Sequence, residues 1–77
     1  MIKKSLKIKE YNAMEQYQKK VIKEKEELDA KLEKLDSFLL TPLAKSLPKI
    51  DFELMENQRN IMFKYSILLG ARIQRWI

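Results

Sequence analysis

The chain has 77 residues, of which 45% are hydrophobic and 35% are charged, and its formal net charge at pH 7 is +5. This length has room for one small domain, and a composition with one glycine and two prolines is typical of long helices. The absence of cysteine and histidine excludes disulfides, thiolate metal sites and the commonest general base. The composition therefore argues against an enzyme and predicts no bound metal or cofactor.

No apolar run reaches the roughly 18 residues that a membrane span requires, and the first six residues lack the core of a signal peptide. We therefore expect a cytoplasmic protein with no membrane partner. The positive charge favours anionic partners such as phosphates, nucleic acid or an acidic protein surface. The central lysines alternate with acidic residues, which is typical of a solvated face and not of a duplex-DNA reader. Nucleic acid is therefore not the expected partner.

The first half of the chain has the pattern of one long helix. Residues 1–8 alternate apolar residues with lysines, and we interpret them as a basic N-terminal arm or a helix extension. From about residue 9 to 40 the apolar residues recur at intervals of three and four, which predicts a helix. Thr41-Pro42 should end this helix, because proline lacks an amide proton and pushes the preceding residue out of helical geometry.

The second half begins with a short connection. Residues 42–48 have room for a helical turn in which Leu43 and Leu47 would cover the end of the domain. Asp51 offers a side-chain acceptor for the free amides of a second helix. This helix is predicted over about residues 52–75.

Because the connection is short, the two helices should pair as a long antiparallel hairpin, so the predicted fold is all-α with residues 9–77 as a single helical-hairpin domain. In this register Lys25 lies near Leu69 and Arg72. Apolar residues of the second helix span more than half of its circumference, which is more than one partner helix can bury. Two helices without a staple rarely bury enough area for stability, so we expect a homo-oligomeric helical bundle.

Three polar residues interrupt the apolar stripe of the second helix, where Gln58, Tyr65 and Arg72 recur at intervals of seven. In the antiparallel pairing the Arg72 end of this stripe meets cationic and aromatic residues of the first helix. Arginine presents a planar fork of donors to phosphate, and tyrosine offers a ring on which a base can stack. The pattern predicts a nucleotide pocket. Its candidate ligand-binding residues are Tyr11, Tyr17, Lys25, Tyr65 and Arg72.

Each of these residues also has a structural interpretation. Lys25 could extend its stem along the seam and hold its ammonium in water, or it could set the register of the helices. Arg72 could pair with Glu24 or another carboxylate across the helices. Tyr65 could be a core aromatic residue with its hydroxyl at the rim.

Residues in both predicted helices form a recognisable pattern. In the first helix they are the run from Lys20 to Leu32, Leu35 and Phe38. In the second they are Gln58, Met62, Tyr65-Ser66, Leu69-Gly70 and Arg72-Ile73. In these residues the chain resembles a family of short tailed-phage proteins named after a product of a crAss-like phage. The resemblance covers roughly residues 18–76 and implies a phage origin without an activity.

The layout is also similar to that of phage anti-CBASS sponges, small helical oligomers that sequester cyclic-nucleotide signals. This resemblance implies that Tyr11 or Tyr17, together with Lys25, holds a nucleotide. The leading prediction is a phage counter-defence protein that sequesters a nucleotide immune messenger, of the cyclic oligonucleotide or ADP-ribose type, without catalysis. The alternatives are a helical module that inhibits a host protein and a nucleic-acid accessory protein that uses the lysines of the N-terminal arm.

Overall fold

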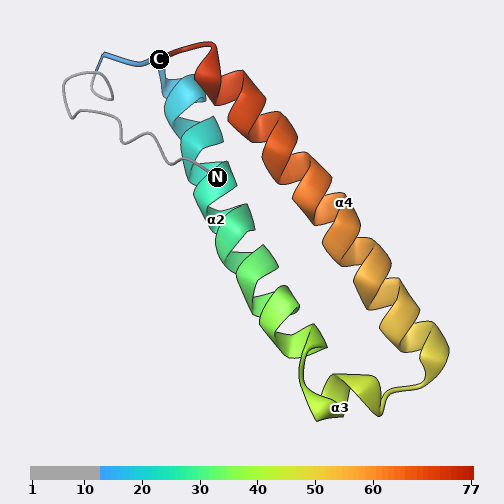
Figure 1. The fold of residues 1–77 in the computed structure, drawn as a ribbon. Helices are drawn as coiled ribbons and strands as arrows, with labels where there is room; N and C mark the ends of the chain where they lie inside the picture. The colour runs from blue at the N-terminus through green and yellow to red at the C-terminus, as the bar shows by residue number, and fades with distance from the viewer. Residues whose placement is uncertain (1–12) are drawn as a thin grey trace.

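The computed structural model describes residues 13–77, which form two long antiparallel helices joined through one short helix (Figure 1). Helix α2 spans Gln16–Leu39, α3 spans Pro42–Lys45 and α4 spans Lys49–Gln74. The C-terminus lies beside the start of α2, and the molecule measures 48 × 19 × 16 Å. The predicted all-α helical hairpin is therefore confirmed, and it is one pair of helices thick.

Helix α2 begins at Gln16 and not at about residue 9. Glu15 has an extended backbone, and its amide donates a 2.9 Å hydrogen bond to Oε1 of Gln18. This contact satisfies an amide at the helix start, as the glutamine of a capping box does. Residues 13–15 are consequently not helical. Residues 1–12, which include the predicted arm and Tyr11, lie outside the described part of the chain.

Thr41 joins the end of α2 to α3. Its hydroxyl donates to the carbonyl of Phe38 at 2.6 Å and accepts from the amide of Ala44 at 3.2 Å. Ala44 is fully buried, whereas Leu43 is 64% exposed and Leu47 is half-buried. The small alanine, and not Leu43 as predicted, therefore closes the end of the hairpin, because the turn of α3 directs Ala44 inward.

Helix α4 begins at Lys49, directly after Pro48, and not at residue 52. Proline suits this boundary because its fixed φ and missing amide proton cost nothing before a helix. Asp51 therefore lies in the first turn and does not cap the helix as predicted. Its carboxylate still complements the positive end of the helix dipole, and Arg72 in the last turn complements the negative end.

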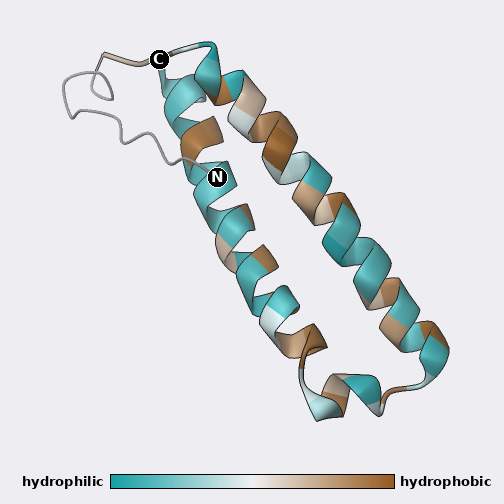
Figure 2. Cartoon of the chain, viewed as in Figure 1, coloured by the Kyte–Doolittle hydropathy of each residue, from teal (hydrophilic) through white to brown (hydrophobic). Residues whose placement is uncertain are grey.

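The hydrophobic core of the hairpin is small. Among the described residues the buried hydrophobic side chains are Val21, Leu32, Ala44 and Leu69. Many large hydrophobic residues are exposed instead, and bands of apolar colour recur along the full length of α4 (Figure 2). Within residues 13–77, neither long helix has the length and apolar character that a bilayer span requires.

Four exposed residues of α4, which we call the outer stripe, share one face of the helix. They are Ile50, Leu54, Ile61 and Leu68, each between 58% and 68% exposed. At about 100° per residue, Gln58, Tyr65 and Arg72 flank this stripe. The predicted polar-and-apolar stripe is therefore a single face, but it lies beside the face that meets α2 and is not the seam of the hairpin.

Candidate functional site

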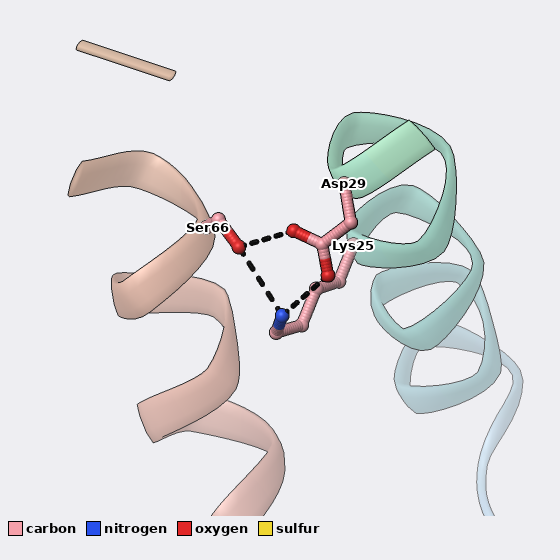
Figure 3. A network of polar contacts seen from close by, with 3 residues as sticks. All are labelled: Lys25, Asp29 and Ser66. Atoms are coloured by element: carbon pink, nitrogen blue, oxygen red, sulfur yellow. Dashed lines mark hydrogen bonds and ion pairs between the residues drawn. The ribbon is translucent and has the colours of Figure 1, made fainter. Parts of the chain in front are cut away.

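A polar cluster joins the two long helices near the middle of the hairpin. Lys25 and Asp29 lie one turn apart on α2, and Ser66 faces them from α4 (Figure 3). Nζ of Lys25 lies 2.6 Å from Oδ2 of Asp29 and donates to Oγ of Ser66 at 3.1 Å. The Ser66 hydroxyl in turn donates to Oδ1 of Asp29. These three side chains form a closed triangle of hydrogen bonds.

The triangle holds the side chain of Lys25 in the seam. Its side chain is only 15% exposed, so its ammonium does not extend into water as one interpretation predicted. A Cβ built on Gly70 would lie 3.2 Å from Cε of Lys25, which means that the glycine gives the lysine stem its space. Ser66 is itself buried. This geometry favours the interpretation in which Lys25 sets the register of the helices.

Tyr65 lies next to this cluster but on the exposed side of α4. Its hydroxyl donates to Oε2 of Glu24, and its side chain is 41% exposed. The hydrogen bond to Glu24, followed by burial and the charge of Glu24, raises the pKa of Tyr65, while the charge of Arg72 lowers it. Tyr65 is therefore not a core aromatic residue, and Glu24, which one interpretation paired with Arg72, accepts from Tyr65 instead.

The open end of the hairpin carries an aromatic pair. The rings of Tyr17 and Trp76 meet edge to face, with centroids 5.8 Å apart and planes at 85°. Such geometry is favourable for aromatic rings, and it ties the start of α2 to the end of the chain. Tyr17 remains 58% exposed, so one side of its ring is accessible to a ligand.

The predicted ligand residues thus fall into three groups. Tyr65 and Arg72 share the exposed flank of α4, and Arg72 is close enough to affect the titration of Tyr65. Lys25 is beneath them in the seam, and Tyr17 is at the open end. Tyr11 lies outside the described residues. The predicted residues therefore do not form one cluster in the described part of the chain, and Lys25 is committed to internal partners.

A depression at the opposite end of the molecule was not predicted. It is lined by Lys45, Leu47, Lys49 and Phe52, where α3 turns into α4. It is open to solvent and distant in the hairpin from the Arg72 end of α4. Its lysines therefore provide a control for experiments on Arg72.

The prediction also missed a second polar contact across the seam. Nε of Arg59 lies 2.6 Å from Oδ1 of Asp36, and Nη2 donates to Oδ2 at 3.3 Å. This hydrogen bond raises the pKa of Arg59, and the guanidinium also lies 4.8 Å from the ring centroid of Phe63. One signal could have revealed both contacts. Asp29 and Asp36 are spaced by seven on the first helix, as Arg59 and Ser66 are on the second.

Together these features define a class of protein: a small all-α hairpin whose seam mixes a narrow apolar core with polar contacts. A family model described as Sequestin matches residues 15–75, and the chain belongs to the Sequestin family. No curated protein and no solved structure matches the chain. The matched region contains the three helices described within residues 13–77, and therefore both the seam and the exposed flank of α4.

Proposed function

We propose that this protein binds and sequesters a nucleotide second messenger, of the cyclic oligonucleotide or ADP-ribose type, without converting it. The observation that carries the proposal is membership of a family whose name indicates sequestration, over residues 15–75. A protein that only withholds a ligand needs affinity and no catalytic group. A chain without histidine or cysteine meets that requirement.

The proposed ligand site is the exposed flank of α4 together with the open end of the hairpin. Arg72 would hold phosphate oxygens, since a guanidinium can donate two parallel hydrogen bonds to them. Tyr65 and Tyr17 are exposed and would offer ring faces to bases. Lys25 would contribute only if the ligand replaced Asp29 or Ser66 as the partner of its ammonium.

The biological setting belongs to the same proposal. We infer that the protein is phage-encoded and acts in the host cytoplasm against an immune pathway that signals through nucleotides. The support is the resemblance of residues 18–76 to short tailed-phage proteins, joined to the sequestration that the family name indicates. The protein would act as a homo-oligomer, because so much of its apolar surface is uncovered in one hairpin.

The test is calorimetry with a panel of cyclic dinucleotides, cyclic trinucleotides and ADP-ribose derivatives. We expect one member to bind at low micromolar concentration or below and to be recovered intact after the protein is denatured by heat. Arg72→Ala should weaken binding at least about tenfold, because a charge-assisted hydrogen bond is lost. Lys45→Ala removes a cation from the opposite end and should leave the affinity unchanged.

Other outcomes would overturn the proposal. If no member of the panel binds at tens of micromolar, or if the recovered ligand is altered, sequestration of these nucleotides is wrong. The outer stripe would then favour the alternative, a helical module that inhibits a host protein, since an exposed apolar face marks interaction surfaces. Strong salt-dependent binding to generic DNA would instead favour a nucleic-acid accessory protein.

A further inference from the structure

The outer stripe of α4 has the spacing of a helix-pairing seam. Leu54, Ile61 and Leu68 are seven residues apart, and Gln58, Tyr65 and Arg72 follow each of them by four residues. This alternation has the spacing of a heptad, with apolar residues at one of its two seam positions and polar or amphipathic residues at the other. Ile61, in the middle of the outer stripe, is 68% exposed, so the single hairpin leaves the centre of the outer stripe uncovered.

Charge on α4 is distributed unequally along the helix. Its acidic residues all lie in the first third: Asp51, Glu53 and Glu56. Lys64 and Arg72 lie in the second half and Arg75 follows directly at the C-cap, whereas Arg59 is neutralised within the chain by Asp36. Lys49 in the first turn is the exception to this separation. One α4 helix therefore has an acidic start and a basic end along its exposed side.

We propose that the outer stripe binds the outer stripe of a second copy of this chain, with the two α4 helices antiparallel and crossing at Ile61. In that arrangement Ile61 meets its own counterpart, and Leu54 meets Leu68 of the second copy. The acidic start of each helix lies beside the basic end of the other. The contact is self-complementary, as a two-fold interface must be.

The flanking charges select this orientation. Asp51 and Arg72 lie on the same side of the stripe, and antiparallel helices bring equivalent flanks together. Asp51 then reaches the level of Arg72 of the second copy at both ends of the interface. A parallel pair would place acid beside acid and would align the two helix dipoles unfavourably. Electrostatic complementarity therefore specifies the orientation, and apolar burial supplies the affinity.

This inference deepens the homo-oligomer in the proposed function by naming its surface, orientation and register, and it does not depend on the nucleotide. The test uses the natural absence of cysteine from the chain. Leu54→Cys and Leu68→Cys are made separately and oxidised in a glutathione buffer, alone and as an equimolar mixture. Ile67→Cys, on another exposed face of α4, replaces Leu68→Cys in the control mixture.

We expect a disulfide-linked dimer in the Leu54→Cys and Leu68→Cys mixture alone. In the antiparallel pair, position 54 of one copy would lie about 21 Å along the axis from position 54 of the other, which is too far for a disulfide. A dimer formed by Leu54→Cys alone would indicate a parallel pair and overturn the proposal. Absence of a specific dimer from the mixture, with both variants helical by circular dichroism, would also overturn it.

Sedimentation gives a second measurement that introduces no cysteine. The native chain should sediment as a dimer of the 9.3 kDa protomer at tens of micromolar. Ile61→Glu should weaken the dimer at least a hundredfold, because it places two carboxylates against each other at the two-fold axis. Ile67 is a matched isoleucine that is 57% exposed, and Ile67→Glu should leave the dimer intact. Equal effects of the two variants, or a native monomer, would contradict the proposal, while nucleotide binding by that monomer would leave the function standing.

Discussion

The seam face and the outer stripe of α4 differ in how their side chains are covered. The seam face combines the buried Leu69 with two polar groups, Arg59 and Ser66, each held by a carboxylate of α2. The outer stripe contains isoleucine and leucine side chains that are mostly exposed. A free monomer would gain by covering that stripe.

The difference indicates that the two faces have separate roles. Polar contacts across the seam have fixed partners, so they select one register of the hairpin even though they contribute modest net stability. An apolar stripe has no such geometric restriction, but it contributes affinity in proportion to the area that it buries. Within the chain the seam specifies how the helices pair, and the outer stripe is available for association.

The largest expected effect on stability comes from comparing two neighbouring leucines, one in the seam and one on the outer stripe. Leu69 is fully buried, whereas Leu68 is 58% exposed on the outer stripe. Leu69→Ala should lower the free energy of unfolding by about 2–5 kcal/mol at every protein concentration, because it leaves a cavity in the seam. Leu68→Ala should destabilise the protein only at concentrations at which the protein self-associates. Urea denaturation at several protein concentrations measures both, and a concentration-independent loss for Leu68→Ala would remove the distinction.

The polar triangle should show the next largest effect. Asp29→Ala removes the carboxylate partner of Lys25 and should cost about 1–2 kcal/mol, because a nearly buried ammonium then lacks its counter-charge. The combined variant Lys25→Met, Asp29→Leu and Ser66→Ala should recover most of that loss, since no polar group remains unpaired. Thermal denaturation compares the two. Equal destabilisation of both would mean that the cluster stabilises through its shape and not through its charges.

Gly70→Ala tests the space that the seam leaves for Lys25. Alanine usually stabilises a helix interior by about 0.5–1 kcal/mol relative to glycine. Here the new methyl would lie 3.2 Å from Cε of Lys25, whose ammonium is held at its far end, so the native chain should gain nothing. In a Lys25→Ala background the usual gain should return. A full gain in the native chain, measured by chemical denaturation, would show that the lysine stem moves freely.

Tyr65 should give the smallest effect, and it appears only at high pH. Because Glu24 raises the folded-state pKa of Tyr65, the resulting stabilisation is present below the ordinary pKa of 10.0 and is lost as the pH rises through the raised value. Phenolate absorbance of the native chain minus that of Tyr65→Phe isolates this titration. Glu24→Gln should shift it back toward the ordinary pKa. An unchanged titration in Glu24→Gln would contradict the contact.

The sequence predicted the fold because its signals were local. Thr41-Pro42 ends the first helix, and because the connection is short, the second helix must run antiparallel to the first. The register also agrees, since Lys25 was expected near Leu69, and its ammonium donates to Ser66, one turn before Leu69, while its stem passes beside Gly70. The predicted start of the second helix was wrong. Pro48 lies directly before the first residue of α4, so the aspartate that was expected to cap the helix lies inside its first turn.

The orientation of α4 could not be predicted from its own residues. Leucine, isoleucine and methionine occur around most of its circumference, so hydrophobic periodicity does not select an inward face. The selection comes from α2, where Asp29 and Asp36 turn toward the seam and require Ser66 and Arg59 opposite them. The candidate site was affected by the same ambiguity. Tyr65 and Arg72 were expected beside the ammonium of Lys25 and instead lie on the outer flank.

The hairpin has one closed end and one open end, and this has a consequence for the order in which it assembles. The contact of Asp36 with Arg59 spans 23 residues, whereas that of Lys25 with Ser66 spans 41. Closing the larger loop costs about 0.5 kcal/mol more in chain entropy, and the Tyr17 contact with Trp76 spans more still. The contacts between α2 and α4 should therefore form first near α3 and last at the open end. Amide protons beside Tyr17 and Arg72 should exchange sooner than those near Asp36, so the proposed ligand end forms last and frays first.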